Sequence, residues 1–348
     1  MNYVVKQGDT ISKVALAFQI RPFDLLLNNP TILNEKSYLR PGLILKIPPF
    51  QTNEHDPFHL ETEYGPSDLE KDVLKLENLG VKVGECGRSV MGKSLYQFEI
   101  GTGEKEVFYS GGWHANEAHT SKFLIHFLFT LAEANKKKKR LYNYSVSQLL
   151  KEVTLTVVPM VNPDGIELVE QGIYEEHPYY KMINEINKGQ KRFEHWSSNI
   201  RGVDLNHQWP AGWEIEAKES PQKPWSRHYS GIAPLTEPEA IAVYELTMQK
   251  EFAYVLAFHS QGQVIYWGYR GYEPPESEQM VEKLSLASSY TPIHTADSDG
   301  GYKDWFILEK GRPGFTIEVG NGMNPLPNDA FAEIWSNNIL LALEGLIL

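Results

Sequence analysis

The sequence predicts an α/β protein with a mixed, mostly buried central sheet flanked by helices, preceded by a small separate module. Three observations support this prediction. From about residue 67 onward, short apolar runs typical of buried strands alternate with helical stretches. A segment at 50–66 is rich in proline and acidic residues, as expected for a linker. The 348 residues are enough for two domains, which we place at 1–49 and 67–348.

The first 49 residues show a βααβ pattern. A strand is expected at 3–5, and the turn Gly8-Asp9-Thr10 supplies a helix N-cap. Apolar residues then recur at helical spacing through 11–18 and 23–27. Pro41-Gly42 turns the chain into a closing strand at 43–47.

Three motifs follow one another in this module: QGDT, NNP and LRPGLILKIP. With them, the module resembles the LysM module over its whole length. The resemblance implies binding of glycans that contain N-acetylglucosamine, such as peptidoglycan and chitin. The residues that would line the sugar groove are Gly8, Asp9, Thr10, Ile11, Asn28, Asn29 and Pro30. The alternative is a small structural cap without a ligand.

The larger region is expected to form one domain that opens with a helix at 67–79. Strands are expected in VKVGECGRSV, SLYQFEI, EVFYSGGW, VTLTVVPMV, FAYVLAFHS and GFTIEVG. Further helices are expected at 119–134, 237–250, 276–289 and 328–345. In such a sheet, reactive groups collect at the carboxyl ends of the strands.

The composition argues against several classes of partner. Lys and Arg number 33 against 45 Asp and Glu, a formal net charge of -12, so we expect neither nucleic acid nor a membrane as partner. No apolar run approaches the roughly 20 residues that span a bilayer. The opening MNYVVKQGDT lacks the pattern of a signal peptide, and the single Cys86 excludes an intrachain disulfide. Synthesis in the cytoplasm is therefore expected.

Two metal-binding side chains follow the predicted strand EVFYSGGW, His114 and Glu117 in the motif HANE. A third candidate, His259, ends the predicted strand FAYVLAFHS. Catalytic zinc commonly takes two histidines and one glutamate and keeps a fourth position for water. These residues therefore predict one Zn²⁺ per chain, although H-x-x-E alone is a weak signal.

Two acidic residues strengthen this prediction. Glu318 lies inside the apolar strand FTIEV, where a carboxylate is costly unless it has a task. Beside the metal it could act as general base and then protonate the leaving amine, and the alternative is a structural ion pair. Asp204, in RGVDLNHQWP, could accept a hydrogen bond from a ligand histidine, or it could be an ordinary turn residue.

The ordered motifs HANE, NPDG, RGVDLNHQWP, FHSQG, GGYKDW and FTIEVG resemble the M14 zinc carboxypeptidase family from about residue 60 to the end. Within it, NHQWPAGW and FHSQGQVIYWG resemble the bacterial branch of γ-D-glutamyl-diamino-acid endopeptidases, which often carry LysM modules and cut peptidoglycan stem peptides. The resemblance implies that His114, Glu117 and His259 bind zinc and that Glu318 is catalytic. It assigns Asp204 to the support of a ligand, and it suggests the spore or cell wall as the place of action after release.

Three positions depart from the carboxypeptidase pattern. The Asn-Arg pair that holds the terminal carboxylate is here Asn206-His207, and an imidazole cannot form the bidentate pair of a guanidinium. For the arginine that polarises the scissile carbonyl, Arg201 is the nearest candidate, two residues off the usual spacing. The loop tyrosine is replaced by Ala296; Tyr302 could substitute for it or could simply pack in the core.

Lys303 occupies the position at which family members that cut before basic residues carry an aspartate. A lysine there should favour a side chain that ends in a carboxylate, as that of meso-diaminopimelate does, unless Lys303 points to solvent.

Together these features predict a zinc peptidase that hydrolyses the γ-D-glutamyl–meso-diaminopimelate bond, with peptidoglycan glycan and stem peptides as partners. One rival is an exopeptidase for α-linked peptides. The other is a non-catalytic protein that binds the spore coat or the wall.

Overall fold

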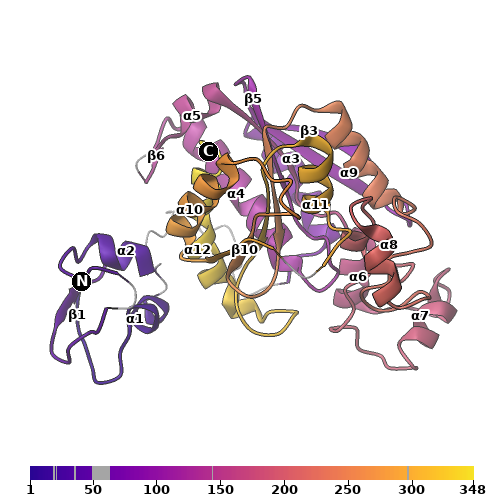
Figure 1. Ribbon diagram of the computed structural model, residues 1–348, viewed down its shortest axis with the longest axis horizontal. Helices are drawn as coiled ribbons and strands as arrows, with labels where there is room; N and C mark the ends of the chain where they lie inside the picture. The colour runs from indigo at the N-terminus through magenta and orange to yellow at the C-terminus, as the bar shows by residue number, and fades with distance from the viewer. Residues whose placement is uncertain (19, 21, 35–36, 49–62, 143, 296–297) are drawn as a thin grey trace.

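The computed structural model describes residues 1–18, 20, 22–34, 37–48, 63–142, 144–295 and 298–348 (Figure 1). Most of the predicted linker and Ala296 therefore lie outside the described residues.

The N-terminal module has the expected βααβ order. Strand β1 (Asn2–Val4) pairs antiparallel with β2 (Ile44–Lys46), and α1 (Ile11–Ala17) and α2 (Pro22–Leu27) lie between them in the chain. Strand β1 is shifted by one residue from the predicted strand at 3–5, and β2 is shorter than the predicted strand at 43–47. The module has its own core, formed by Val5, Ile11, Val14, Ala15, Ile20, Leu25, Leu39, Leu45 and Ile47.

The larger unit is built on an eight-stranded sheet in the order β11-β10-β12-β9-β5-β8-β4-β3. The strands are β3 (Lys82–Arg88), β4 (Ser94–Gly101), β5 (Lys105–Ser110), β8 (Val153–Val158), β9 (Tyr254–His259), β10 (Val264–Tyr266), β11 (Thr291–Ile293) and β12 (Gly314–Glu318). The central strands β12, β9, β5 and β8 run parallel, whereas β3, β4 and β10 are antiparallel to their neighbours toward the centre. The predicted mixed sheet is thus confirmed, and four carboxyl ends meet at one edge.

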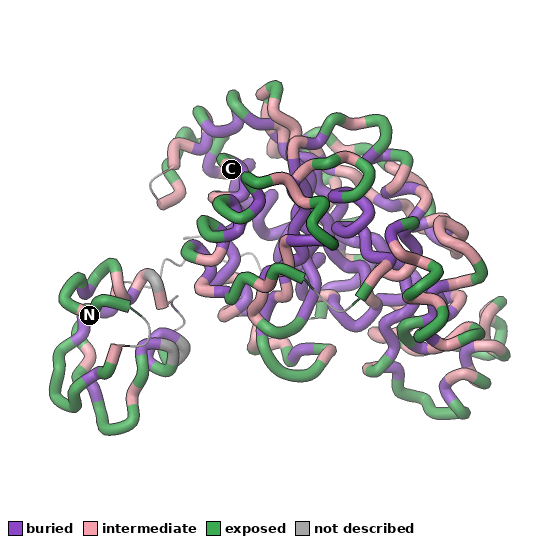
Figure 2. The backbone as a smooth tube through the Cα atoms, in the orientation of Figure 1, coloured by how far each residue is buried: buried purple, intermediate pink, exposed green. Residues whose placement is uncertain are grey.

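Helices cover both faces of this sheet (Figure 1). On one face, α4 (Ala118–Lys136), α10 (Glu276–Ser288) and α12 (Phe331–Glu344) pack with α3 (Pro66–Asn78) and α5 (Val146–Glu152). On the other face, α9 (Pro238–Gln249) and α11 (Tyr302–Lys310) enclose a second core. Neighbouring residues of β5 and β9 alternate between the two cores, because side chains of a strand point to opposite faces. Figure 2 shows the central strands buried and the outer surfaces of the helices exposed.

Several short elements escaped prediction. They are α5, β10, β11, α6 (Pro163–Gln171), α7 (Tyr180–Ile186), α8 (Trp213–Glu219), α11, the 3₁₀ turn η1 (Leu205–His207) and the strand pair β6 (Arg140–Leu141) and β7 (Tyr144–Ser145). The predicted helix at 328–345 is a 3₁₀ turn, η2 (Asn328–Ala330), followed by α12. Among the helices of the described residues, none combines the length and apolar character that crossing a membrane requires.

Candidate metal centre

A tight turn at the end of β5 presents His114. The backbone of Gly112 has a φ of +60°, and a Cβ atom there would lie 2.4 Å from Ser121 Oγ and 3.0 Å from the Cα of Met160. Only glycine therefore fits this turn without a shift. The next residue, Trp113, is fully buried, and its indole nitrogen donates to Ser110 Oγ at 3.1 Å. These contacts fix the chain as it delivers His114 to the sheet edge.

Glu117 caps the N-terminus of the 19-residue helix α4. The positive end of the helix dipole favours a carboxylate at this position. Asn324 Nδ2 donates a hydrogen bond of 3.3 Å to Glu117 Oε1. His259, the last residue of β9, is 1% exposed and completes the group from the neighbouring strand.

The ligand atoms of the three side chains lie close to the spacing of a tetrahedral zinc site, with His114 and Glu117 nearer to each other than the ideal. His114 Nδ1 lies 2.8 Å from Glu117 Oε1 and 3.4 Å from His259 Nδ1, and His259 Nδ1 lies 3.3 Å from Glu117 Oε2. Ligand atoms about 2.1 Å from a tetrahedral ion lie roughly 3.4 Å apart. Glu117 Oε2 is buried without a hydrogen-bond partner among the described residues, so a cation would satisfy it. The group fits Zn²⁺.

Asp204 supports the first of these ligands. Its Oδ1 lies 3.1 Å from His114 Nε2 and accepts from the backbone N of Asn206, and its Oδ2 accepts from the backbone N of His228. Burial raises the pKa of Asp204, but the neighbouring histidines, His114 first, outweigh this and hold it well below the ordinary value. An ionised Asp204 accepts a hydrogen bond from the Nε2–H of His114, which leaves Nδ1 of the ring free to bind metal.

Glu318 stands next to His259, its register partner across the parallel pair β12–β9. Among the described residues, none forms a hydrogen bond or an ion pair with its carboxyl group. Burial, together with the negative charge of Glu117, raises the pKa of Glu318 to about 8. A carboxyl group with these properties beside a metal site can hold and release a proton.

His207, which stands at the position of the expected arginine, contacts Glu216 and His228. Its Nδ1 lies 3.4 Å from Glu216 Oε1, and its ring stacks on that of His228 with centroids 5.6 Å apart. Asn206 Oδ1 accepts from the backbone N of Tyr302 at 3.2 Å. Asn206 and His207 are thus linked to the segment that carries Lys303.

Lys303 is buried. Its Nζ donates to the carbonyl oxygen of Gly268 at 2.7 Å and lies 2.5 Å from Asp304 Oδ1. The alternative that Lys303 points to solvent is therefore wrong.

Tyr302 is a core residue and not a catalytic one. Its side chain is fully buried and packs against Phe108, Trp113 and Trp209. Its hydroxyl lies 3.0 Å from that of Thr247 on α9. The interpretation of Tyr302 as a substitute for the loop tyrosine is wrong because the hydroxyl faces the core.

Arg201 is held by two residues that do not belong to the metal group. Its Nε donates to the hydroxyl of Tyr179 at 3.3 Å, and Nη1 lies 3.6 Å from Glu237 Oε2. The side chain is 42% exposed. Its assignment as the carbonyl-polarising arginine stays a prediction.

In the LysM module, two of the predicted groove residues, Ile11 at the start of α1 and Asn29, are buried. Ile11 is fully buried, and Asn29 is tied to β2 through hydrogen bonds with the N and O of Lys46. Asp9 accepts from the backbone N of Lys6 and from the Tyr3 hydroxyl. Four of the predicted groove residues are exposed: Gly8, Thr10, Asn28 and Pro30.

Two supporting residues were not predicted. Asn324 contacts Glu117, as described, and also donates to the carbonyl oxygen of Ser260 at 2.7 Å. His228 has a left-handed backbone with φ of 64°, and in this conformation its N–H reaches Asp204. Asn324 lies in a loop without regular pattern, and His228 donates through its backbone, so neither contact leaves a signal in the sequence.

A mixed sheet that carries a His-Glu-His group and a neighbouring glutamate on its strand ends defines a zinc metallopeptidase. The chain belongs to the M14 zinc carboxypeptidase family, whose model matches residues 75–340, and a LysM domain model matches residues 3–48.

Its relatives include a γ-D-glutamyl-L-diamino acid endopeptidase 1 of Lysinibacillus sphaericus. It is 42% identical over 290 residues, which are 83% of this chain and 73% of the relative. The uncharacterized protein YqgT of Bacillus subtilis is 36% identical over 283 residues, which are 79% of this chain and 75% of YqgT. Bovine thrombin-activatable fibrinolysis inhibitor, solved with a tick carboxypeptidase inhibitor, has the same fold with a TM-score of 0.66 at 19% identity, over 83% of this chain and 98% of that chain.

Proposed function

We propose that this enzyme hydrolyses the γ-D-glutamyl–meso-diaminopimelate amide of peptidoglycan stem peptides. The observation that carries the proposal is the complete metal group with Glu318 beside it, in a chain 42% identical to a relative named for a γ-D-glutamyl-L-diamino acid endopeptidase. The state of His207 supports the endopeptidase class over the exopeptidase class. Its imidazole lies near the Glu216 carboxylate and stacks on the His228 ring. It cannot form the bidentate hydrogen bonds that an arginine makes with a terminal carboxylate.

The residues of the chain have distinct tasks in this reaction. His114, Glu117 and His259 would hold zinc, which lowers the pKa of water and polarises the scissile carbonyl when bound. Glu318 accepts the proton of the attacking water and passes it to the nitrogen of the departing diaminopimelate. Asp204 keeps His114 in the tautomer that binds metal. Arg201 is the candidate for stabilising the negative charge on the carbonyl oxygen.

The N-terminal module is proposed to tether the enzyme to the glycan strands of peptidoglycan at the cell wall or spore. The domain boundaries that we propose are 1–49 for the module, 50–66 for the linker and 67–348 for the peptidase. A tether raises the concentration of enzyme at the wall, where stem peptides are attached or released, without changing the reaction.

The decisive experiment compares three peptides with the purified, zinc-loaded protein. They are L-Ala-γ-D-Glu-meso-diaminopimelate, the same peptide extended by D-alanine, and an α-linked isomer with a free carboxyl terminus. We expect cleavage of both γ-linked peptides and little cleavage of the isomer, with Glu318→Gln as the inactive control. Preferred cleavage of the α-linked isomer would identify an exopeptidase, and cleavage of none would identify a binding protein.

A further inference from the structure

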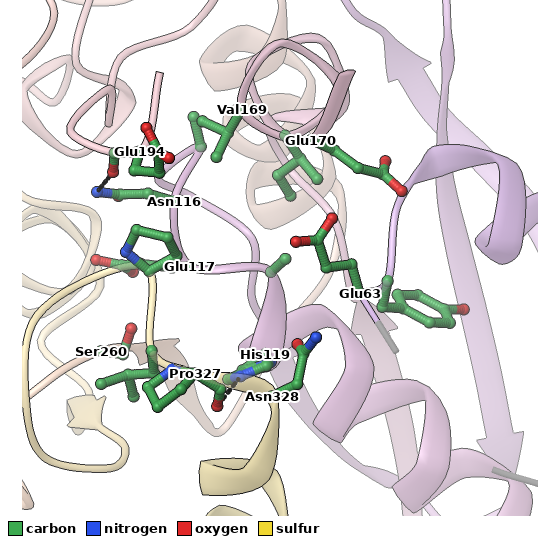
Figure 3. Close-up of a pocket in the computed structure, with 16 residues that line it drawn as sticks. Glu63, Asn116, Glu117, His119, Val169, Glu170, Glu194, Ser260, Pro327 and Asn328 are labelled. Atoms are coloured by element: carbon green, nitrogen blue, oxygen red, sulfur yellow. Dashed lines mark hydrogen bonds between the residues drawn. The ribbon is translucent and has the colours of Figure 1, made fainter. Parts of the chain in front are cut away.

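A pocket of about 350 Å³ opens beside Glu117 (Figure 3). It is lined by Glu63 and Tyr64 before α3, by residues 115–119, by α6 and by the loop 325–328. Asn206, His207 and Lys303, which we associate with the carboxyl side of the scissile bond, do not line it. The pocket therefore suits the part of the substrate that precedes the scissile bond.

The charges that line this pocket are negative. Figure 3 shows Glu63 and Glu170 at one end and Asn116 with Glu194 at the other, while Glu117 belongs to the metal group. The one histidine in the lining, His119, uses its Nε2 in a hydrogen bond of 3.0 Å with the carbonyl oxygen of Pro327.

The hydrogen-bond donors of the lining are mostly occupied. The Tyr64 hydroxyl donates to Asp72, Ser260 Oγ to Asn324 Oδ1, and Asn116 Nδ2 to the carbonyl oxygen of Glu194.

Acceptors, by contrast, are left over. Asn116 is 4% exposed, and its Oδ1 has no hydrogen-bond partner among the described residues. Glu170 Oε2 likewise lacks one, and it lies against Gly65, the residue that follows the lining residue Tyr64. A pocket with negative charge and spare acceptors is complementary to a cation that carries N–H donors.

Burial raises the pKa of Glu170, and the negative charges of Asp68 and Glu63 raise it further. A cation bound near Glu63 and Glu170 would reduce this repulsion.

We propose that this pocket binds the free α-ammonium group of the L-alanine that begins the stem peptide. This inference rests on the proposed function, since it places L-Ala-γ-D-Glu on this side of the metal. In an extended L-Ala-γ-D-Glu unit, the ammonium lies roughly 8 Å from the scissile carbon, far enough to leave the metal group and reach the glutamates. The α-carboxylate of the glutamate lies nearer the scissile carbon, close to the positive charge of the metal.

The proposal also places the enzyme in a reaction sequence. In intact peptidoglycan the nitrogen of L-alanine forms an amide with the lactyl group of the glycan, so it carries no positive charge. The substrate must then be supplied by hydrolysis of that amide. The enzyme would act on peptides already released from the glycan.

The test compares L-Ala-γ-D-Glu-meso-diaminopimelate with the same peptide acetylated on alanine. For the wild type, acetylation should lower kcat/KM about tenfold, mainly through KM, as expected for one partly desolvated charge pair. In Glu63→Gln/Glu170→Gln, the two peptides should differ only about twofold, because the variant and the acetyl group remove the same interaction. High salt should reduce the preference of the wild type.

Two further variants serve as controls for this comparison. Glu176→Gln removes a charge at an exposed position outside the pocket and should keep the wild-type ratio. Glu63→Gln alone changes an exposed residue and should lower the ratio partly, even if the double variant folds poorly.

Equal kcat/KM for both peptides with the wild type would overturn the inference and leave the proposed function standing. An undiminished preference in the glutamine variants would show that the ammonium binds elsewhere. Cleavage of neither peptide would overturn the proposed function itself.

Discussion

Asp204 Oδ1 lies 3.1 Å from Nε2 of His114, on the side of the imidazole opposite the metal group. The carboxylate is 1% exposed, and backbone N–H groups of Asn206 and His228 hold it in place. The pair orients a ligand that comes from a loop and not from a strand. It therefore links the metal site to the segment that carries His207.

Replacing Asp204 with alanine should weaken zinc binding without removing a ligand. We expect a loss of about 10- to 100-fold in affinity, the usual effect of removing the partner of a ligand histidine. Competition with a chromophoric chelator measures it. As a control, Asp329→Asn changes an exposed residue and should bind about one zinc ion per chain, as the wild type should. His259→Ala removes a ligand and should no longer bind zinc. Wild-type affinity in Asp204→Ala would show that His114 needs no such support.

Glu318→Gln should keep its zinc and lose several orders of magnitude in kcat. The amide fills the same space beside His259 but cannot accept the proton of water. Metal analysis and steady-state kinetics on the γ-linked peptides measure the two effects separately. Turnover near the wild-type rate would remove Glu318 from the reaction.

The elements that sequence predicted well are those with strong local patterns. The strands β5, β8, β9 and β12 are rich in apolar residues, and the residues at or just after the ends of β5, β9 and β12 gave His114, Glu117, His259 and Glu318 as candidates. Because the carboxyl ends of parallel strands meet at one edge, the convergence of these residues followed from the sheet type.

Other features depend on contacts between distant segments. Whether Tyr302 packs or reacts depends on Thr247, which lies 55 residues away. The burial of Lys303 depends on the carbonyl oxygen of Gly268, which no side-chain pattern reveals. The pocket beside Glu117 joins α3, α4, α6 and the loop before α12, so it has no counterpart in any single stretch of sequence.

Glu239 should make the protein less stable as the pH rises. This carboxyl group is fully buried and accepts a hydrogen bond from the backbone N of Val90. Burial, with the nearby charges of Asp164 and Glu237, raises its pKa from 4.5 to about 7. Between these values the folded protein keeps a proton that the unfolded chain has lost, so the free energy of unfolding decreases as pH rises from about 4.5 to 7 and stays low above it.

Glu239→Gln removes this dependence. Between pH 5 and pH 8, the free energy of unfolding of this variant should rise by up to about 2.5 kcal/mol relative to that of the wild type, as linkage gives for this pKa shift. Urea denaturation of both proteins at several pH values measures the difference. Glu245→Gln, on the exposed side of the same helix, should follow the wild type. A constant difference between Glu239→Gln and the wild type would contradict the assignment.

Deleting residues 1–49 should separate wall binding from catalysis. The module has its own core, so its removal should leave hydrolysis of small soluble stem peptides nearly unchanged. Sedimentation with insoluble peptidoglycan should fall, because the tether no longer raises the local concentration. Equal sedimentation of the truncated and full-length proteins would give the module another purpose.

Lys303 is proposed to recognise the side-chain carboxylate of meso-diaminopimelate. An ammonium group has three donors, and Gly268 and Asp304 take two of those of Lys303, which leaves one for the substrate. Peptides with meso-diaminopimelate should therefore be cleaved much faster than peptides with L-lysine at that position. A desolvated charge pair can discriminate by roughly 2–5 kcal/mol, of which part is the cost of an unpaired charge.

A single change at Lys303 would leave Asp304 buried without its partner, so the better variant is Lys303→Gln/Asp304→Asn, which removes both charges. Asp304→Asn alone serves as the control and should keep the preference for diaminopimelate, because the ammonium is still present. The double variant should lose most of that preference while still cleaving both peptides. The measurement is the ratio of kcat/KM for the two peptides in each protein. If the double variant kept the wild-type ratio, recognition of the diamino acid would have to be assigned to residues other than Lys303.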